Sequence, residues 1–209
     1  MRRGKVLSLK NFKFMDFLVK NNILTVLVIL ITAGVAVGIF TESKLELLSN
    51  YSASYLERFT ALRTGESFIS VAVSSFMGSA LILLAVFTTG TSMLGVVLVP
   101  LLALLKGVLY GAVSALLYSE YAIKGIAFNA ILIVPSAFIF VIAFLFAARE
   151  SMRFSLLMAK ISLPGATSVN LAFDFKNYCG RYLLIILIVL ASALTDAVLS
   201  CSFLEGLML

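Results

Sequence analysis

Five long runs of apolar residues constrain the fold of this chain more than any other feature. They cover roughly residues 22–40, 68–88, 93–118, 123–146 and 181–203. A helix needs about 20 apolar residues to cross the hydrocarbon core of a bilayer, and each run approaches or exceeds that length. Backbone groups in lipid must form hydrogen bonds within their own segment, which predicts a helix for each run. Because the runs are continuous rather than alternating, a membrane β-barrel is excluded.

The composition is that of an integral membrane protein. Of the 209 residues, 62% are hydrophobic and 12% are charged. A soluble domain is nearer half apolar and one quarter charged. We therefore predict an all-α, polytopic membrane bundle with about five transmembrane helices, which residues 1–209 form as a single membrane domain. The short turn at residues 89–92 predicts an antiparallel hairpin of the second and third helices, and a re-entrant arrangement of one of them is the alternative.

Lysine and arginine residues are distributed unequally between the two predicted sides of the membrane. With five crossings, the basic tail 1–21 and the segment 147–181 share one side and together carry eleven of them. The other side carries four, three of which lie in the segment 41–66. The positive-inside rule therefore places the N-terminus in the cytoplasm and the C-terminus outside. Because these charges lie at membrane edges, the net charge of +6 does not indicate a nucleic-acid partner.

Two charged residues and two prolines interrupt the apolar runs. Lys106 lies near the middle of its run, and at that depth we expect its amine to face protein or trapped water. Asp196 is the only acid well inside a run and is the candidate partner of Lys106, because a neutralising pair lowers the cost of burial. The alternative is that Asp196 lies near the outer headgroups. Pro100 and Pro135 each lack a backbone donor, and we expect each to kink its helix.

Small residues recur at four-residue spacing in two of the runs. Gly34 and Gly38 form such a pair in the first run, and Gly107 and Gly111 form another in the third. This spacing lets helix backbones approach closely, which is a common way for membrane helices to associate. We expect these faces to pack within one chain, with association into a homo-oligomer as the alternative.

The segment 45–62 has apolar residues at helical spacing, with polar residues between them. This pattern predicts an amphipathic helix on the outer side of the membrane. It can lie on the membrane or on the bundle, or it can serve as a docking surface for an extracytoplasmic partner. The candidate docking residues are Glu46, Tyr55, Glu57 and Phe59.

The sequence gives little support for catalysis. It contains no histidine, which removes the ordinary general base and the commonest metal ligand. The Gly-x-Ser-x-Gly, Walker and His-Glu-x-x-His motifs are also absent. We therefore expect no enzymatic activity, no cofactor and no metal site.

Several of these features occur together in one known family. They are Gly95 and Pro100 at the start of the third run, Leu-Leu-Lys-Gly at 104–107 followed by Gly111, Pro135, and Ser-Ala-Leu-Thr-Asp-Ala at 192–197. With the basic tail, the outer segment and the chain length, they resemble the stage II sporulation protein M family of five-helix membrane proteins.

The resemblance implies a non-enzymatic scaffold in the bacterial cell membrane that takes part in engulfment during sporulation. Such a protein positions two peptidoglycan-degrading partners, the stage II sporulation proteins D and P. The alternative is a subunit of a membrane transporter or permease in which Lys106 and Asp196 line a path. The buried charges favour transport, whereas the absence of an internal repeat weighs against it.

Overall fold

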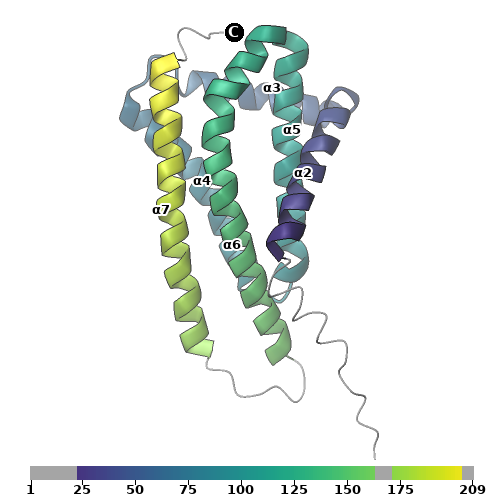
Figure 1. The fold of residues 1–209 in the computed structure, drawn as a ribbon, viewed down its shortest axis with the longest axis vertical. Helices are drawn as coiled ribbons and strands as arrows, with labels where there is room; N and C mark the ends of the chain where they lie inside the picture. The colour runs from purple at the N-terminus through teal and green to yellow at the C-terminus, as the bar shows by residue number, and fades with distance from the viewer. Residues whose placement is uncertain (1–22, 163–170, 204–209) are drawn as a thin grey trace, which may run out of the picture.

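The computed structural model describes residues 23–162 and 171–203, and this part of the chain is helical with no strand. The predicted basic tail 1–21 lies outside the described residues, as do residues 163–170. The helices follow the apolar runs (Figure 1). In chain order they are α2 (Ile23–Thr41), the short η2 (Glu42–Lys44), α3 (Glu46–Ala61), α4 (Phe68–Gly90), α5 (Gly95–Phe128), the π-helical η3 (Asn129–Ile133), α6 (Val134–Ile161) and α7 (Leu171–Phe203).

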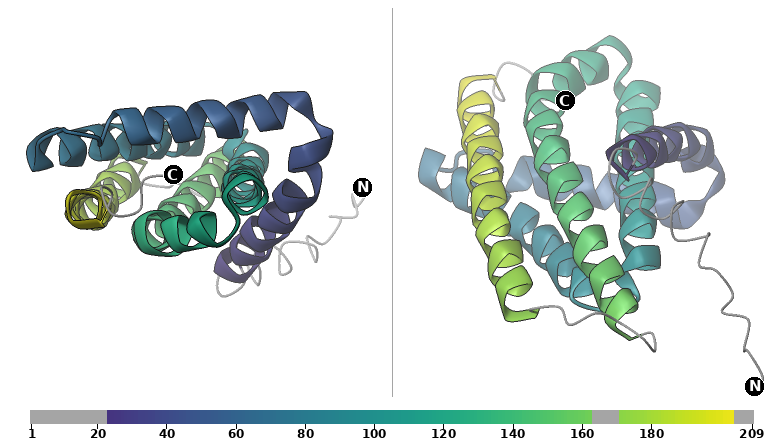
Figure 2. Two further views of the ribbon diagram at one scale, coloured as in Figure 1. Left: turned by 90° about the horizontal axis from the view of Figure 1, so that it is seen from above. Right: turned by 60° about the horizontal axis from the view of Figure 1, so that its bottom comes forward.

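Four segments of the described chain are long and apolar enough to cross a membrane, which confirms the predicted helical membrane bundle. They are Ile23–Lys44, Phe68–Gly90, Gly95–Ile161 and Leu171–Phe203. The third segment contains both α5 and α6, which lie side by side because the chain turns back between them (Figures 1 and 2). The five crossings and their orientation stay predictions.

The chain reverses direction within α5, near its C-terminal end, without a connecting loop. Ala122 has φ 45° and ψ −123°, which breaks the helix and redirects the chain. Such a conformation is costly for a residue with a Cβ, and Ala122 is exposed, so contacts between the flanking helical segments must hold it in place. Gly125 follows, and a Cβ there would lie 1.9 Å from the carbonyl oxygen of Leu117. Only glycine permits this close approach of the two arms.

The two intrahelical prolines have different surroundings. Pro135 stands in the first turn of α6, directly after η3. In η3 the N–H of Val134 donates to the carbonyl of Asn129. This wider π-helical turn directly precedes Pro135, whose nitrogen has no hydrogen to donate, and it accommodates the proline in the helix. At Pro100 the backbone of α5 remains helical, and its non-helical residue is Ala122.

Helix α3 lies across one end of the bundle, roughly perpendicular to the long helices (Figures 1 and 2). The turn from α5 to α6 and the last residues of α7 lie at the same end, which we call the α3 end. The inward face of α3 buries Ser52, Leu56 and Phe59, with Phe59 against Phe128. The amphipathic segment therefore packs on the bundle with one face and leaves the other exposed.

Helices α2 and α5 contact each other through the four predicted glycines. A Cβ on Gly34 would lie 2.4 Å from the carbonyl oxygen of Leu104, and one on Gly38 would lie 2.1 Å from that of Val108. Cβ atoms on Gly107 and Gly111 would each lie 2.2 Å from a carbonyl oxygen of α2. The two small-residue faces thus meet within one chain, and we call this contact the glycine seam.

The last helix starts earlier than the sequence pattern predicts. The apolar run begins at residue 181, but α7 begins at Leu171 and buries Tyr178 and Tyr182. Helix α6 also continues past the apolar run, to Ile161. Much of the segment 147–181 is therefore part of two long helices, because aromatic side chains there pack against α4 and α6.

We expect Gly38→Ala to reduce bundle stability by about 1–3 kcal/mol, because the added methyl group would meet the backbone of α5. Gly180→Ala is the matched control, since a Cβ there meets nothing within 4 Å. Unfolding of the purified protein in mixed micelles measures both changes. Equal stabilities of the two variants would show that the glycine seam does not require small residues.

The orientation can be tested with cysteines introduced at two exposed serines, Ser54 in α3 and Ser162 after α6. The background variant carries serine in place of Cys179 and Cys201. A membrane-impermeant maleimide should label Ser54→Cys in intact cells and label Ser162→Cys only after the membrane is opened, as the charge bias predicts. The reverse pattern would invert the topology.

Candidate functional site

A polar cavity of about 340 Å³ lies between α3, α4, α5, α6 and α7. Its wall combines charged, hydroxyl-bearing and aromatic side chains. The lining residues that carry charges or hydroxyl groups are Tyr51, Tyr55, Arg58, Arg63, Ser74, Ser75, Ser79, Lys106, Tyr110, Ser136, Ser192 and Asp196. We call this space the polar cavity. It brings Lys106 and Asp196 to one site, together with several residues that the sequence pattern does not single out.

Asp196 is paired with Arg63. A terminal nitrogen of Arg63 lies 2.5 Å from Oδ2 of Asp196, and both side chains are less than a tenth exposed. Ser75 donates a hydrogen bond to the same carboxylate oxygen. The other terminal nitrogen of Arg63 donates to the carbonyl of Phe59 at 3.0 Å, and the guanidinium lies 3.6 Å from the centre of the Phe59 ring.

This pairing corrects the partner expected for Asp196, which is Arg63 rather than Lys106. Arg63 follows the C-terminus of α3 and reaches inward, so that its guanidinium meets α7 and α4 at one point. A buried carboxylate is stable only when it is paired and hydrogen-bonded. The ion pair therefore connects the end of α3 to the bundle.

Lys106 faces protein, as the sequence predicts, but its neighbours are aromatic. Its ammonium lies 4.9 Å from the ring centre of Tyr110 and 5.2 Å from that of Phe140. The faces of aromatic rings attract cations at such distances. Among the described residues, no carboxylate lies within ion-pair distance of Lys106.

Charge and burial give the polar cavity a distinct electrostatic character. Its wall contains three basic residues, Arg58, Arg63 and Lys106, and one acid, Asp196. Burial raises the pKa of Tyr55 to about 12, with smaller effects from Arg63, which lowers the pKa, and Asp196, which raises it. Tyr55 therefore keeps its hydroxyl proton and stays neutral at neutral pH. The three basic residues outnumber the one acid, so the cavity carries a net positive charge.

A second polar cluster lies at the opposite end of the bundle and joins three helices. Ser151 of α6 donates to the carbonyl of Val86 in α4 at 2.9 Å. Its hydroxyl oxygen lies 3.0 Å from that of Tyr178 and 2.6 Å from that of Tyr182, both in α7. We call these residues the serine–tyrosine cluster. It has no charged member and is surrounded by the apolar core.

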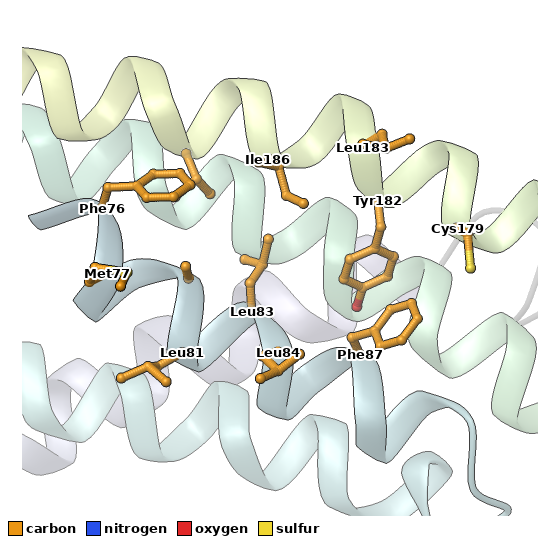
Figure 3. Close-up of a pocket in the computed structure, with 12 residues that line it drawn as sticks. Phe76, Met77, Leu81, Leu83, Leu84, Phe87, Cys179, Tyr182, Leu183 and Ile186 are labelled. Carbon is orange, nitrogen blue, oxygen red and sulfur yellow. The ribbon is translucent and has the colours of Figure 1, made fainter. Parts of the chain in front are cut away.

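An apolar groove of about 430 Å³ runs between α4 and α7 (Figure 3). Phe76 and Leu83 of α4 face Ile186 and Tyr182 of α7 across it. Its rim includes the exposed side chains of Met77, Leu81, Leu84 and Leu183. The groove has almost no polar surface, as expected for a surface between two membrane-spanning helices.

The four candidate docking residues of α3 divide into exposed and inward-facing positions. Glu46 and Glu57 are exposed and Tyr55 is half-buried. Phe59 is buried, because it packs against Phe128 and beneath Arg63. Phe59 therefore does not belong to the exposed face of α3.

Arg63 is the main site residue that sequence reasoning misses. In the sequence it is one of several charges on the predicted outer side, just after the amphipathic segment. Its contacts with Ser75 of α4 and Asp196 of α7 are tertiary, so the local sequence pattern carries no signal for them. Within residues 23–162 and 171–203, no group of three acidic or cysteine side chains forms a metal site.

Removing one partner of the ion pair should be costly. We expect Asp196→Ala to destabilise the bundle by about 3–5 kcal/mol, because the Arg63 guanidinium is left buried without a counter-charge. The double variant Arg63→Met with Asp196→Leu should recover part of that loss. Micelle unfolding of Arg63→Met, Asp196→Leu and the double variant, each compared with the wild-type chain, measures the coupling energy.

Lys106→Met provides the contrast for this experiment. It should destabilise the bundle less than Asp196→Ala, because within the described residues Lys106 contacts aromatic rings and forms no ion pair. A large coupling energy between Lys106 and Asp196, with none between Arg63 and Asp196, would contradict the observed pairing.

Comparison with known proteins identifies the family. The family model described as stage II sporulation protein M matches residues 10–200, which is most of the chain. No curated protein and no solved structure shows a significant match. The family match confirms the resemblance seen in the sequence and supports a sporulation-related membrane protein. The chain belongs to the stage II sporulation protein M family.

Proposed function

We propose that this protein is a non-enzymatic scaffold in the bacterial cell membrane, which organises peptidoglycan-degrading partners during engulfment. By family resemblance, these partners are the stage II sporulation proteins D and P. The scaffold role requires a surface outside the membrane that is held rigidly on the membrane domain. We assign this surface to helix α3, which packs on one end of the bundle with one face and leaves the other exposed.

The anchoring of α3 is the observation that carries the proposal. Leu56 and Phe59 bury one face of the helix in the bundle, and the Arg63–Asp196 pair holds the chain just after its C-terminus. A surface fixed in this way loses little conformational freedom when a partner binds, which favours affinity.

The exposed face of α3 has the mixed character of a protein-binding surface. Leu47 is 88% exposed and Tyr51 is 42% exposed, and Glu46, Glu57 and Arg58 are exposed beside them. Apolar and aromatic anchors surrounded by charges are typical of protein interfaces. The charge pattern favours a partner with a complementary, partly basic face.

Transport of a solute is the second candidate function, and the polar cavity is the observation that favours it. Buried charges in a membrane domain often mark a substrate path. Solute flux by the purified protein in liposomes would favour transport over the scaffold role.

We expect Glu46→Lys with Glu57→Lys to weaken capture of the cell-wall partners by at least about tenfold, because both changes reverse charge on the exposed face. Co-purification with tagged partners from sporulating cells, compared with the wild-type chain, measures the loss. The matched control is Glu66→Lys with Glu120→Lys, which makes the same charge change at exposed positions outside α3.

Circular dichroism and membrane extraction show whether the variants stay folded and inserted. Equal partner capture by the α3 variant and its control would contradict the role of α3 as the docking surface.

A further inference from the structure

The polar cavity holds more positive than negative charge at a place where charge is expensive. Three basic residues line it and one acid opposes them. The charge of that acid is balanced by Arg63, because Oδ2 of Asp196 pairs with Arg63 and accepts a hydrogen bond from Ser75, while Oδ1 has no hydrogen-bond partner among the described residues. The positive charges of Lys106 and Arg58 therefore have no carboxylate partner on the cavity wall. In a medium of low dielectric constant, such an excess attracts an anion strongly.

Lys106 is placed to contact a ligand. It lines the cavity from α5, and its ammonium lies beside the rings of Tyr110 and Phe140. The rings stabilise the charge without neutralising it. All three donor positions of an ammonium point along different directions, so contact with ring faces still leaves donors for an oxygen ligand.

The remaining wall supplies hydroxyl donors and an opening. Ser79 and Tyr110 both line the cavity, and neither hydroxyl has a hydrogen-bond partner among the described side chains. Tyr51, Arg58, Leu62 and Gly78 are cavity-lining residues that are also exposed, so they mark its mouth. A ligand can reach Lys106 from there past α3 and α4.

We propose that the polar cavity binds a phosphate group, with Lys106 as its principal charge partner and Arg58 at the mouth. Lysine and arginine with neighbouring hydroxyls are the usual ligands of phosphate oxygens. The group can belong to the headgroup of an anionic lipid or to free phosphate, since both present the same oxygens. This site does not depend on the scaffold role, although Tyr51 and Arg58 at its mouth also belong to the exposed face of α3.

Two ligands distinguish these sources. The full-length protein in phosphatidylcholine nanodiscs is supplied with phosphatidate, a lipid with a phosphate monoester headgroup, and native mass spectrometry measures the bound lipid. Calorimetric titration of the same nanodiscs with inorganic phosphate measures the free ion. Binding of phosphatidate alone assigns a lipid headgroup, and binding of inorganic phosphate assigns the free ion.

Two variants test the cavity by different means. Lys106→Met removes the charge and nearly keeps the volume. Gly78→Leu places a side chain at the cavity wall, where an added Cβ meets no atom within 4 Å, so the helix tolerates it. The matched controls are Lys124→Met, at an exposed lysine outside the cavity, and Gly180→Leu, at a glycine of α7 with equally open surroundings.

We expect each cavity variant to weaken phosphate binding at least about tenfold, and each control to stay within about twofold of the wild-type chain. The proposal is overturned if phosphatidate and inorganic phosphate both fail to bind. Equal binding by the wild-type chain, Lys106→Met and Gly78→Leu also overturns it. If Lys106→Met does not fold, the binding measured with Gly78→Leu decides the proposal, because that variant fills the cavity without removing a charge.

Discussion

Every backbone N–H and C=O group of the apolar segments must find its partner inside the chain, because a bilayer supplies none. This constraint makes the segments helical and leaves side chains to decide how the helices meet. Helices α2 and α5 meet at the glycine seam, where backbone approaches backbone. At the other contacts, hydroxyl groups bond directly to carbonyls of neighbouring helices, as Ser151 does to Val86. Association thus relies on close packing and hydrogen bonds rather than on exclusion of water.

Charge is concentrated where the membrane domain meets α3. The Arg63–Asp196 pair brings together the chain after α3, the carboxylate of α7 and the hydroxyl of Ser75 in α4. Burying two charges is costly, and only a well-placed pair with further hydrogen bonds compensates for it. The same pair therefore positions the exposed face of α3 and fixes the electrostatic balance of the polar cavity. The proposed docking surface and the proposed phosphate site are consequently two faces of one arrangement.

Local patterns account for most of what the sequence predicts correctly. Apolar length places the helices, and the spacing of Gly34 and Gly38 marks a face that does contact another helix. The partner of Asp196 depends instead on tertiary structure, because Arg63 and Asp196 lie 133 residues apart. The start of α7 at Leu171 was missed for a related reason. Its first turns are too polar for an apolar run, and they are helical because Tyr178 finds a buried site between α4 and α6.

The polar cavity and the serine–tyrosine cluster are separated by apolar side chains. Beyond Lys106, the interior is filled by Phe140, Phe144 and Val189, and then by the serine–tyrosine cluster. The polar cavity is therefore a vestibule with a floor, and within the described residues it does not continue as a pore. For a solute to cross this protein, the apolar side chains and the serine–tyrosine cluster would have to separate. That would break the contacts of Ser151 with α4 and α7 at once. A molecule that enters from the α3 end would instead be retained and leave by the way it came.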